Sequence, residues 1–363
     1  MNKSAKKKIV FVLPDLTSGG AERVMSFVAQ NISKDQFDVY LWLAGYSKNT
    51  KYNVNGIKVI YFNKSRVLKA IPSFYRSLRR VKPQIVISSI SHLNTVMGFL
   101  SLFNPNTKFI GREANVLSVK KHFASGNRKF YGGLTLTKFS YKLLDLVLCQ
   151  SKDMFNDMKN NFGVPEHKLR IINNPITDNF NLKPIKQDKQ KTIQFITVAR
   201  LKEQKGHERI IRALSKIDFP FQYTIVGDGP EKDELFRLID SAGLSDKVIH
   251  IPYTHDVPKY LSESDLFLQG AFVEGFPNCL IESCAVGTPI VAFDAPGGLD
   301  EIIEIGFNGF IARTEEEYKN LIIKAAKNHS WKPEKIRESV LKKFNKEKIL
   351  KQYEDLFCEI IEK

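Results

Sequence analysis

The stretch DLFLQGAFVEGFPNCLIE, residues 265–282, carries the pattern that decides the fold. Its apolar start predicts a buried strand at Asp265–Gln269, and a glycine-containing loop follows. A helix is predicted to start at Pro277 and Asn278, because proline suits the first turn of a helix and asparagine caps it. A strand leading through a loop into a helix is the repeating unit of a parallel sheet, so the stretch predicts an α/β fold.

The same alternation of strand and helix occurs in two blocks along the chain. The strands predicted in the first block are Lys8–Leu13, Phe37–Leu43, Ile57–Phe62, Gln84–Ser89, Lys108–Gly111 and Leu144–Gln150. Those of the second block are Thr192–Ala199, Gln222–Gly227, Lys247–Ile251, Asp265–Gln269, Pro289–Phe293 and Gly309–Ala312. A polar, lysine-rich stretch from Asn173 to Lys191 separates them and is predicted to be the linker. The chain is therefore expected to form two lobes, residues 1–175 and 176–344, with a last helix in residues 345–363.

Length and composition agree with a folded, two-lobed chain. A chain of 363 residues exceeds what one core usually supports, and 43% hydrophobic residues can bury sizeable cores. The four cysteines form no CxxC pair, which argues against a disulfide framework or a zinc site and favours a reduced, cytoplasmic compartment. The apolar run at Ile9–Leu13 is too short for a secretion signal, and no window approaches the roughly 18 apolar residues of a membrane span. We therefore expect a protein that is neither exported nor transmembrane.

Positive charge is concentrated in the first half of the chain. Residues 1–180 hold 28 Lys and Arg against 10 Asp and Glu, a net charge of +18, whereas residues 181–363 hold 27 against 29, a net charge of −2. Basic residues mixed with aromatics between Lys108 and Lys142 could meet an anionic membrane, single-stranded nucleic acid, or only solvent. No nucleic-acid signature is present, so we favour a membrane and expect no nucleic-acid partner. The predicted docking residues are Lys120, Lys121, Arg128 and Lys129.

Two glycine-rich turns follow predicted strands. Gly19 and Gly20 lead into the first helix, and residues 226–232 include Gly227 and Gly229. Such turns let backbone approach a phosphate, or they serve only as strand-to-helix turns. Neither has the third glycine of the dinucleotide fingerprint, which argues against a nicotinamide enzyme.

Charged residues accompany the loops of the second block. Arg200 and Lys205 follow the strand Thr192–Ala199, where a bidentate fork and a mobile point charge suit a diphosphate, although surface loops commonly hold such cations. Glu274 and Glu282 can accept hydrogen bonds from sugar hydroxyls, whereas Glu282 could instead be a glutamate favoured by the helix dipole. A further glycine-rich loop, residues 295–303, opens another helix. Several such loops at one sheet edge predict a ligand site.

In order along the chain, these motifs resemble the family 4 (group 1) retaining glycosyltransferases, which have the two-lobed GT-B fold. Residues 274–282 resemble that family's E-x-F-G/P-x-x-x-x-E signature, with Gly275, Phe276, Pro277 and Asn278 as this chain's variant. The resemblance covers essentially the whole chain and implies two Rossmann-like lobes, one for the acceptor and one for the nucleotide sugar. It also implies a cleft between the lobes and a C-terminal helix that returns to the first lobe.

The resemblance assigns roles to individual residues. It implies that Arg200 and Lys205 bind the donor diphosphate, that Glu282 binds the ribose, and that Glu274 binds the donor sugar near the reacting carbon. The glycine turn at Gly19 and Gly20 would approach the diphosphate from the other lobe. Residues implied in donor binding are Gly19, Gly20, Arg200, Lys205, Gly229, Glu274, Gly275, Phe276, Pro277, Asn278 and Glu282, of which Arg200, Lys205 and Glu274 would be catalytic. No cofactor or metal is expected, since cations and a helix terminus would neutralise the leaving group. His92 follows the fourth predicted strand, where some relatives have a catalytic histidine, but its offset from the strand differs, so it either contacts the acceptor or has a structural or surface role. Glu113, at the end of the next predicted strand, is expected to contact the acceptor.

The motifs look most like those of bacterial enzymes that extend lipid-linked or envelope glycans. We therefore expect transfer of a hexose or N-acetylhexosamine from a UDP-sugar, with retention of configuration, to such a glycan at the cytoplasmic face of the membrane. A lipid-diphosphate acceptor would be an anion, which agrees with the positive first half. One alternative is a UDP-N-acetylglucosamine 2-epimerase of the same fold, which the glutamate pair and the arginine–lysine pair disfavour. The other is a non-catalytic protein that binds anionic surfaces.

Overall fold

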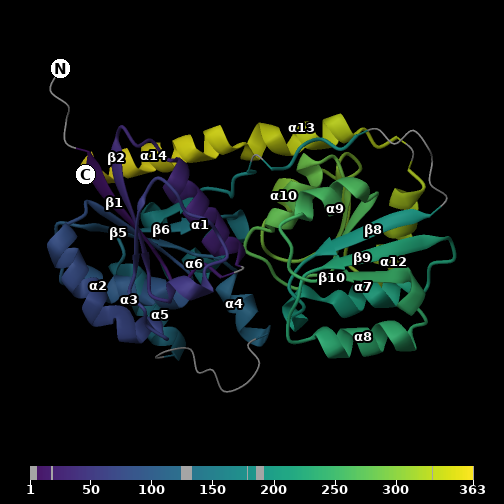
Figure 1. The fold of residues 1–363 in the computed structure, drawn as a ribbon, viewed down its shortest axis with the longest axis horizontal. Helices are drawn as coiled ribbons and strands as arrows, with labels where there is room; N and C mark the ends of the chain where they lie inside the picture. Colours follow the sequence, from purple (N-terminus) through teal and green to yellow (C-terminus); the bar gives the residue numbers. More distant parts are fainter. Residues whose placement is uncertain are drawn as a thin grey trace. The chain divides into compact units, whose positions relative to one another are not determined.

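The computed structural model describes residues 6–17, 19–123, 133–177, 179–184, 192–328 and 330–362 (Figure 1). They form two compact units. Unit 1 comprises the described residues of Met1–Ser118, Ala124–Pro175 and Glu347–Lys363, and unit 2 comprises those of Val119–Phe123 and Ile176–Lys346. The chain passes from unit 1 to unit 2 after Pro175 and returns after Lys346, and the short stretch Val119–Phe123 also belongs to unit 2.

Unit 1 is built on a parallel sheet that has seven strands in its described part, in the order β3-β2-β1-β4-β5-β6-β7. The strands are β1 (Lys7–Leu13), β2 (Phe37–Leu43), β3 (Lys58–Tyr61), β4 (Ile85–Ser89), β5 (Lys108–Arg112), β6 (Leu146–Cys149) and β7 (Leu169–Ile171). Ile9 of β1 pairs with Val39 on one side and Ile85 on the other. The first six strands follow the Rossmann order 3-2-1-4-5-6. The edge strand β7 was not predicted, because a strand this short has almost no periodicity.

Helices cover both faces of this sheet. They are α1 (Gly20–Asn31), α2 (Val67–Val81), α3 (Ser91–Ser101), α5 (Gly133–Leu143), α6 (Lys152–Asn160) and α14 (Lys346–Glu362). The short helix α4 (Leu117–Lys120) is divided between the units, because Val119 and Lys120 belong to unit 2. Along β1, side chains alternate between the faces, so Ile9, Phe11 and Leu13 share one core with α1 and α14. Both faces are therefore buried, as expected for parallel strands that read as continuous apolar runs.

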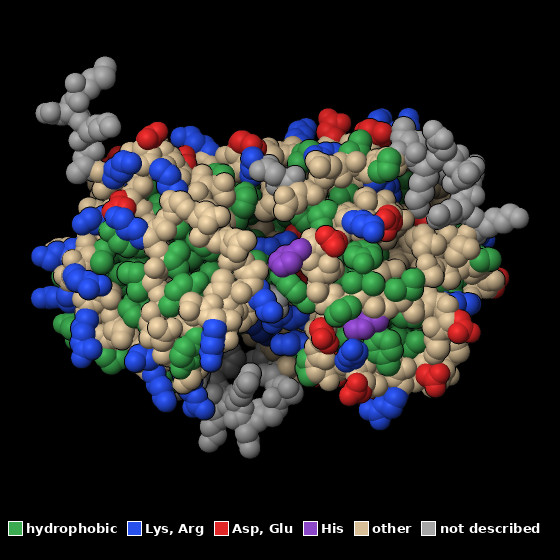
Figure 2. Space-filling model, in the orientation of Figure 1, with side chains coloured by type: hydrophobic (Ala, Val, Ile, Leu, Met, Phe, Trp, Pro, Cys, Tyr) green, Lys and Arg blue, Asp and Glu red, His purple; other side chains and the backbone are tan. Residues whose placement is uncertain are grey.

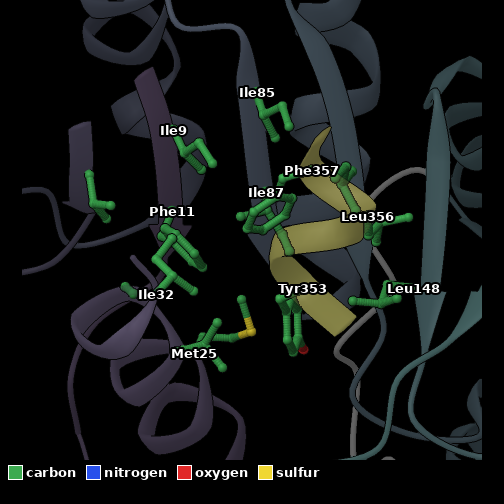
Figure 3. Packing of buried hydrophobic residues seen from close by; sticks show 14 of the residues in the cluster. Ile9, Phe11, Met25, Ile32, Ile85, Ile87, Leu148, Tyr353, Leu356 and Phe357 are labelled. Atoms are coloured by element: carbon green, nitrogen blue, oxygen red, sulfur yellow. The ribbon is translucent and has the colours of Figure 1, made fainter. Parts of the chain in front are cut away.

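The C-terminal helix α14 packs into the core of unit 1, as predicted. Its residues Tyr353, Leu356 and Phe357 lie over the sheet beside Phe11 and Ile87 (Figure 3). The Phe357 ring meets Phe11 and Phe37 edge to face, with centroids 6.1 and 6.0 Å apart. Burying a phenylalanine of this kind stabilises the fold by roughly 1.5–3 kcal/mol. The last helix is therefore part of the first unit, although more than 300 residues separate it from β1 in the sequence.

Unit 2 repeats the arrangement of unit 1. Its described strands are β8 (Ile193–Val198), β9 (Phe221–Val226), β10 (Val248–Ile251), β11 (Leu266–Gln269), β12 (Ile290–Phe293) and β13 (Gly309–Ala312), in the parallel order β10-β9-β8-β11-β12-β13. Its helices are α7 (His207–Leu214), α8 (Lys232–Ser241), α9 (Val257–Glu263), α10 (Asn278–Ala285), α11 (Leu299–Ile302), α12 (Glu315–Ala326) and α13 (Pro333–Phe344). The predicted α/β fold with two Rossmann-like lobes is confirmed. The strands predicted from the sequence lie within two residues of the observed bounds.

The place of β8 in this second sheet matters for function. It lies between β9 and β11, with Ile196 opposite Thr224 on one side and Phe267 on the other. Strand order reverses at β8, and the loops that leave β8, β9, β11 and β12 emerge at the same edge. Ligands of open α/β sheets bind at this kind of edge.

Within unit 2, the start of the segment Ile176–Lys346 bonds to its end. The Ile176 N–H donates to the Phe344 carbonyl at 2.8 Å, and Ile176 forms a parallel bridge with Asn345. Within the described residues, no helix is long and apolar enough to cross a membrane.

Candidate active site

The loop after β8 brings Lys205 to Glu274. This loop, residues 199–206, ends in a single 3₁₀ turn at Glu203–Lys205, and α7 begins at His207. Lys205 Nζ donates to Glu274 Oε1 at 2.6 Å, and the two side chains are 24% and 9% exposed. The contact exists because β8 and β11 are neighbours in the sheet. Two residues that the sequence singled out separately are therefore one ion pair at the sheet edge.

Two glycines let the backbones of these loops touch. A Cβ on Gly206 would lie 2.0 Å from the Gly270 carbonyl oxygen, and a Cβ on Gly270 would lie 2.2 Å from the Gly206 oxygen. No larger residue fits at either position without moving backbone, and Gly206 also has a φ of +57°. Gln204 joins the loops further. Its backbone carbonyl accepts from the Phe272 N–H, and its side-chain Nε2 donates to the Val273 carbonyl, both at 2.9 Å.

The turn after β9 supports the other side of the β8 loop. A Cβ on Gly229 would lie 2.2 Å from the Leu201 carbonyl oxygen. The Leu201 N–H donates to the Asp228 carbonyl at 3.1 Å. Packing against the β8 loop therefore explains the glycine at position 229, and its role in donor binding stays a prediction.

The loop after β12 holds the backbone of Glu274. The Glu274 N–H donates to the Pro296 carbonyl at 2.9 Å, and a Cβ on Gly297 would lie 2.6 Å from the Glu274 carbonyl carbon. The glycines of this predicted motif therefore allow the loop to pack against Glu274. Three loops from three adjacent strands fix the position of one carboxylate.

The helix that follows Glu274 starts at Asn278, within the predicted start at Pro277 and Asn278, but the cap is a different residue. Pro277, with φ −76° and ψ 98°, is the N-cap, and Asn278 is the first helical residue, so the predicted capping role of Asn278 is wrong. The extended ψ of Pro277 keeps it outside the helix. Glu282 is buried in the second turn of α10, and the Phe276 ring packs edge to face on Phe344, with centroids 5.2 Å apart. Contact of these residues with a donor stays a prediction.

Arg209, which the sequence analysis missed, supports the β11 loop from α7. Its guanidinium lies 3.9 Å from the ring centroid of Phe272 and 4.0 Å from that of Phe293. It donates to the Gly270 carbonyl, from Nε at 3.0 Å, and to the Ala271 carbonyl at 2.7 Å. Burial lowers the pKa of this guanidinium, which nevertheless remains charged at neutral pH. No motif marks an arginine that acts by holding backbone.

His207 is a second positioning residue that the sequence analysis missed. The imidazole is buried, and burial, reinforced by the nearby Lys205 charge, lowers its pKa to about 4, although the bond to the Arg200 carbonyl acts in the opposite sense. The ring is therefore neutral at pH 7, and its Nε2–H donates to the Arg200 carbonyl at 3.1 Å. Among the described residues, nothing bonds to Nδ1. His207 thus fixes the backbone of Arg200, whose side chain is exposed.

The lowered pKa of His207 predicts that the protein loses stability in mild acid. Below pH 6.5 the unfolded chain protonates this histidine, while the folded chain does not until about pH 4, so the free energy of unfolding falls with pH over this window. At pH 5 the loss should be about 2 kcal/mol. Urea unfolding at pH 7 and pH 5 measures it.

His207→Gln should remove that pH dependence and keep a donor for the Arg200 carbonyl. The matched control is His167→Gln, because His167 is exposed, and it should behave like the wild type. An unchanged difference between pH 7 and pH 5 in His207→Gln would contradict the assignment.

Unit 1 holds a second group of predicted residues at the carboxyl edge of its sheet. Gly19 caps α1, Gly20 begins it, and His92 is the second residue of α3, directly beyond β4. The Tyr52 hydroxyl donates to the Gly19 carbonyl at 3.1 Å. Ile90, two residues before His92, has a φ of +81°, a strained conformation for a β-branched residue. Backbone strain of this kind concentrates at functional sites, which favours a role for the turn that carries His92.

Glu113 lies in a buried polar cluster. Its carboxylate accepts from the Tyr141 hydroxyl, and from the Ala114 N–H at 2.7 Å. Burial, together with the Glu113 charge, raises the pKa of Tyr141 well above its usual value, so the phenol stays protonated and donates. Contact between Glu113 and an acceptor stays a prediction, and the structure places the carboxylate inside the unit rather than at its surface.

The predicted docking residues are only partly visible. Lys120 is half-buried at the end of α4, whereas the Lys121 side chain, Arg128 and Lys129 lie outside the described residues. In the part of the chain that the structure describes, no cluster of three or more His, Cys, Asp or Glu side chains could hold a metal ion.

Known proteins resemble the chain over both units. Residues 18–180 match the sequence model of Glycosyltransferase Family 4, and residues 178–343 match that of the glycosyl transferases group 1. A Campylobacter jejuni protein named N-acetylgalactosamine-N,N'-diacetylbacillosaminyl-diphospho-undecaprenol 4-alpha-N-acetylgalactosaminyltransferase is 26% identical, over 86% of this chain and 87% of its own.

Solved structures show the same fold. Anabaena Alr3699/HepE in complex with UDP-glucose has a TM-score of 0.80 at 18% identity, covering 97% of this chain and 99% of its own. Sucrose-phosphate synthase from Thermosynechococcus elongatus has a TM-score of 0.83 at 17% identity, covering 98% and 99%. The sequence models match both halves of the chain, and the fold has two Rossmann-like domains, so the chain belongs to the family 4, group 1 glycosyltransferases.

Proposed function

We propose that the protein transfers a hexose or N-acetylhexosamine from a UDP-sugar, with retention of configuration and without a metal, to a lipid-linked or envelope glycan at the cytoplasmic face of the membrane. The observation that carries the proposal is the Lys205–Glu274 pair at the edge where β8 and β11 end. It joins a cation suited to a diphosphate and a carboxylate suited to sugar hydroxyls within one rigid set of loops.

Leaving-group stabilisation would be the main catalytic contribution. Negative charge develops on the departing diphosphate, and Lys205 would move its ammonium from the Glu274 carboxylate onto the phosphate oxygens. The exposed guanidinium of Arg200 would add a bidentate contact, and the first N–H groups of α10 would complete the anion site. Glu274, released from Lys205, would accept hydrogen bonds from the donor sugar.

Two similarities support the choice of donor and acceptor class. The Alr3699/HepE structure contains UDP-glucose, which favours a UDP-sugar donor. The name of the Campylobacter relative specifies a diphospho-undecaprenol acceptor, which favours an acceptor carried on a lipid diphosphate. The net charge of +18 in residues 1–180 agrees with an anionic acceptor.

Release of UDP tests the proposed function. We expect one of UDP-glucose, UDP-galactose and their N-acetylated forms to release UDP when a polyprenyl-diphosphate glycan is added. EDTA should leave the rate unchanged, and NMR should show an α-linked product. An epimerase would interconvert the UDP-sugars without acceptor, and a binding protein would release nothing, so either result would contradict the proposal.

A further inference from the structure

Helices α2, α3 and α5 of unit 1 carry two pairs of aromatic rings at or near the surface. Tyr75 on α2 meets Phe103, just beyond α3, with ring centroids 6.3 Å apart, and Phe99 on α3 meets Phe139 on α5 at 6.1 Å. Phe103 is 60% exposed and Phe139 is 53% exposed. We call Tyr75, Phe99, Phe103 and Phe139 the aromatic ridge. Leu68, Leu102 and Leu136 on or next to the same helices are also exposed, so the apolar surface extends beyond single residues.

The exposed face of α2 is strongly basic. Ala70, Phe74 and Leu78 point into the unit, and the opposite face exposes Lys69, Arg76, Arg79 and Arg80. Between Asp38 and Glu113 the sequence holds twelve Lys and Arg and not one Asp or Glu. On the face of the molecule shown in Figure 2, blue side chains line the border over α2, with green ones among them. The positive charges of α2, which carries Tyr75 of the aromatic ridge, are therefore not neutralised by any acidic residue between positions 38 and 113.

A hollow on α2 is suited to a phosphate group. It has a volume of about 290 Å³ and is lined by Phe62, Ser73, Arg76, Ser77 and Arg80. Arg76 and Arg80 are four residues apart, as are Ser73 and Ser77, so each pair lies on one side of the helix. Two guanidinium groups with two hydroxyls nearby can bind phosphate oxygens in several hydrogen bonds.

We propose that the aromatic ridge and the basic face of α2 dock unit 1 onto an anionic lipid bilayer, with the hollow holding the phosphate of a lipid head group. Aromatic rings and leucines enter the interfacial region, while arginines remain at the level of the phosphates. The inference rests on the proposed function in one respect: transfer to a lipid-linked acceptor is the reason why the protein would bind a membrane. It assigns docking to other residues than Lys120, Lys121, Arg128 and Lys129, which the sequence predicted.

The apolar residues identify a membrane rather than a nucleic acid as the partner. Single-stranded nucleic acid uses cations and stacked aromatic rings, but it has no use for exposed leucines. A bilayer interface accommodates aromatic, aliphatic and basic side chains together.

Co-sedimentation with vesicles tests the proposal without donor or acceptor. The wild type should bind vesicles of equal parts phosphatidylglycerol and phosphatidylcholine, and should bind phosphatidylcholine alone far less. Each cation near an anionic surface raises binding about fivefold, so R76Q/R79Q/R80Q should weaken it roughly 100-fold. F103S/F139S should also weaken binding, but with less dependence on salt.

A matched variant in unit 2 controls for the loss of charge. R212Q/K216Q/K335Q removes three exposed cations as well and should bind vesicles like the wild type. Thermal unfolding checks that all variants are folded. UDP release with a short, water-soluble acceptor should be unchanged in every variant, since none of these residues belongs to the candidate active site.

Each outcome bears on one proposal. Vesicle binding lost only in the α2 and ridge variants supports docking. A wild type that does not bind, an α2 variant that binds like the wild type, or binding of a single-stranded oligonucleotide in place of vesicles would overturn it. Loss of vesicle binding with intact UDP release contradicts only docking, whereas absent UDP release with intact vesicle binding contradicts only the proposed function.

Discussion

Lys205→Ala is expected to lower kcat by about 10²–10³-fold, which corresponds to about 2.7–4 kcal/mol of transition-state stabilisation. Lys205 would contribute most when negative charge develops on the leaving diphosphate, so its loss should affect kcat more than donor binding. The variant also leaves Glu274, which is buried, without the cation that now contacts it at 2.6 Å. Steady-state kinetics with the donor identified by UDP release measure the effect.

Three variants sharpen the interpretation of the Lys205 result. Lys216→Ala, at an exposed position just beyond α7, should keep wild-type kinetics. Lys205→Arg keeps the charge with a different shape and should retain part of the activity. Lys205→Ala combined with Glu274→Gln should cost less than the sum of the single changes, because the two residues act together. Normal turnover in Lys205→Ala would remove the main support for the proposed mechanism.

Gly206→Ala is expected to reduce both stability and activity strongly. A left-handed conformation costs alanine roughly 1–2 kcal/mol. The new methyl group would also lie 2.0 Å from the Gly270 carbonyl oxygen, so backbone must shift at a further cost of about 1–3 kcal/mol. The shift would move the loop that carries Lys205, and we expect at least a 10²-fold loss of activity.

Gly243→Ala separates the clash from the backbone conformation. Gly243 has a φ of +66°, close to the +57° of Gly206, but a Cβ there would meet nothing within 4 Å. Urea unfolding should therefore show a loss of roughly 1–2 kcal/mol for Gly243→Ala, about half or less of the loss for Gly206→Ala, with normal turnover. Equal losses in the two variants would show that the contact between the loops has no energetic importance.

The sequence could predict those residues of the candidate site that have a suitable side chain directly after a predicted strand. Glu274 and Lys205 follow recognisable strands, and a charged residue after a buried strand lies at the ligand edge of a parallel sheet. Arg209 and His207 were not predictable. Arg209 donates to the Gly270 carbonyl and His207 to the Arg200 carbonyl, and no spacing in the sequence marks a bond from a side chain to a backbone carbonyl. For Glu113, the sequence indicated only a place after β5, and it did not predict that the carboxylate bonds to Tyr141 in the interior of the unit.

Apolar periodicity along the sequence was sufficient to determine the strands other than β7, the α/β class and the two-lobed organisation, because strand and helix bury side chains at different intervals over a few residues. Only the tertiary structure decided that Lys205 bonds to Glu274, that Gly206 and Gly270 touch, and that aromatic rings of α2, α3 and α5 or their ends meet in two pairs. Those contacts depend on which strands are neighbours and how closely their loops approach. Local sequence patterns carry no such information, since the contacting residues are far apart along the chain.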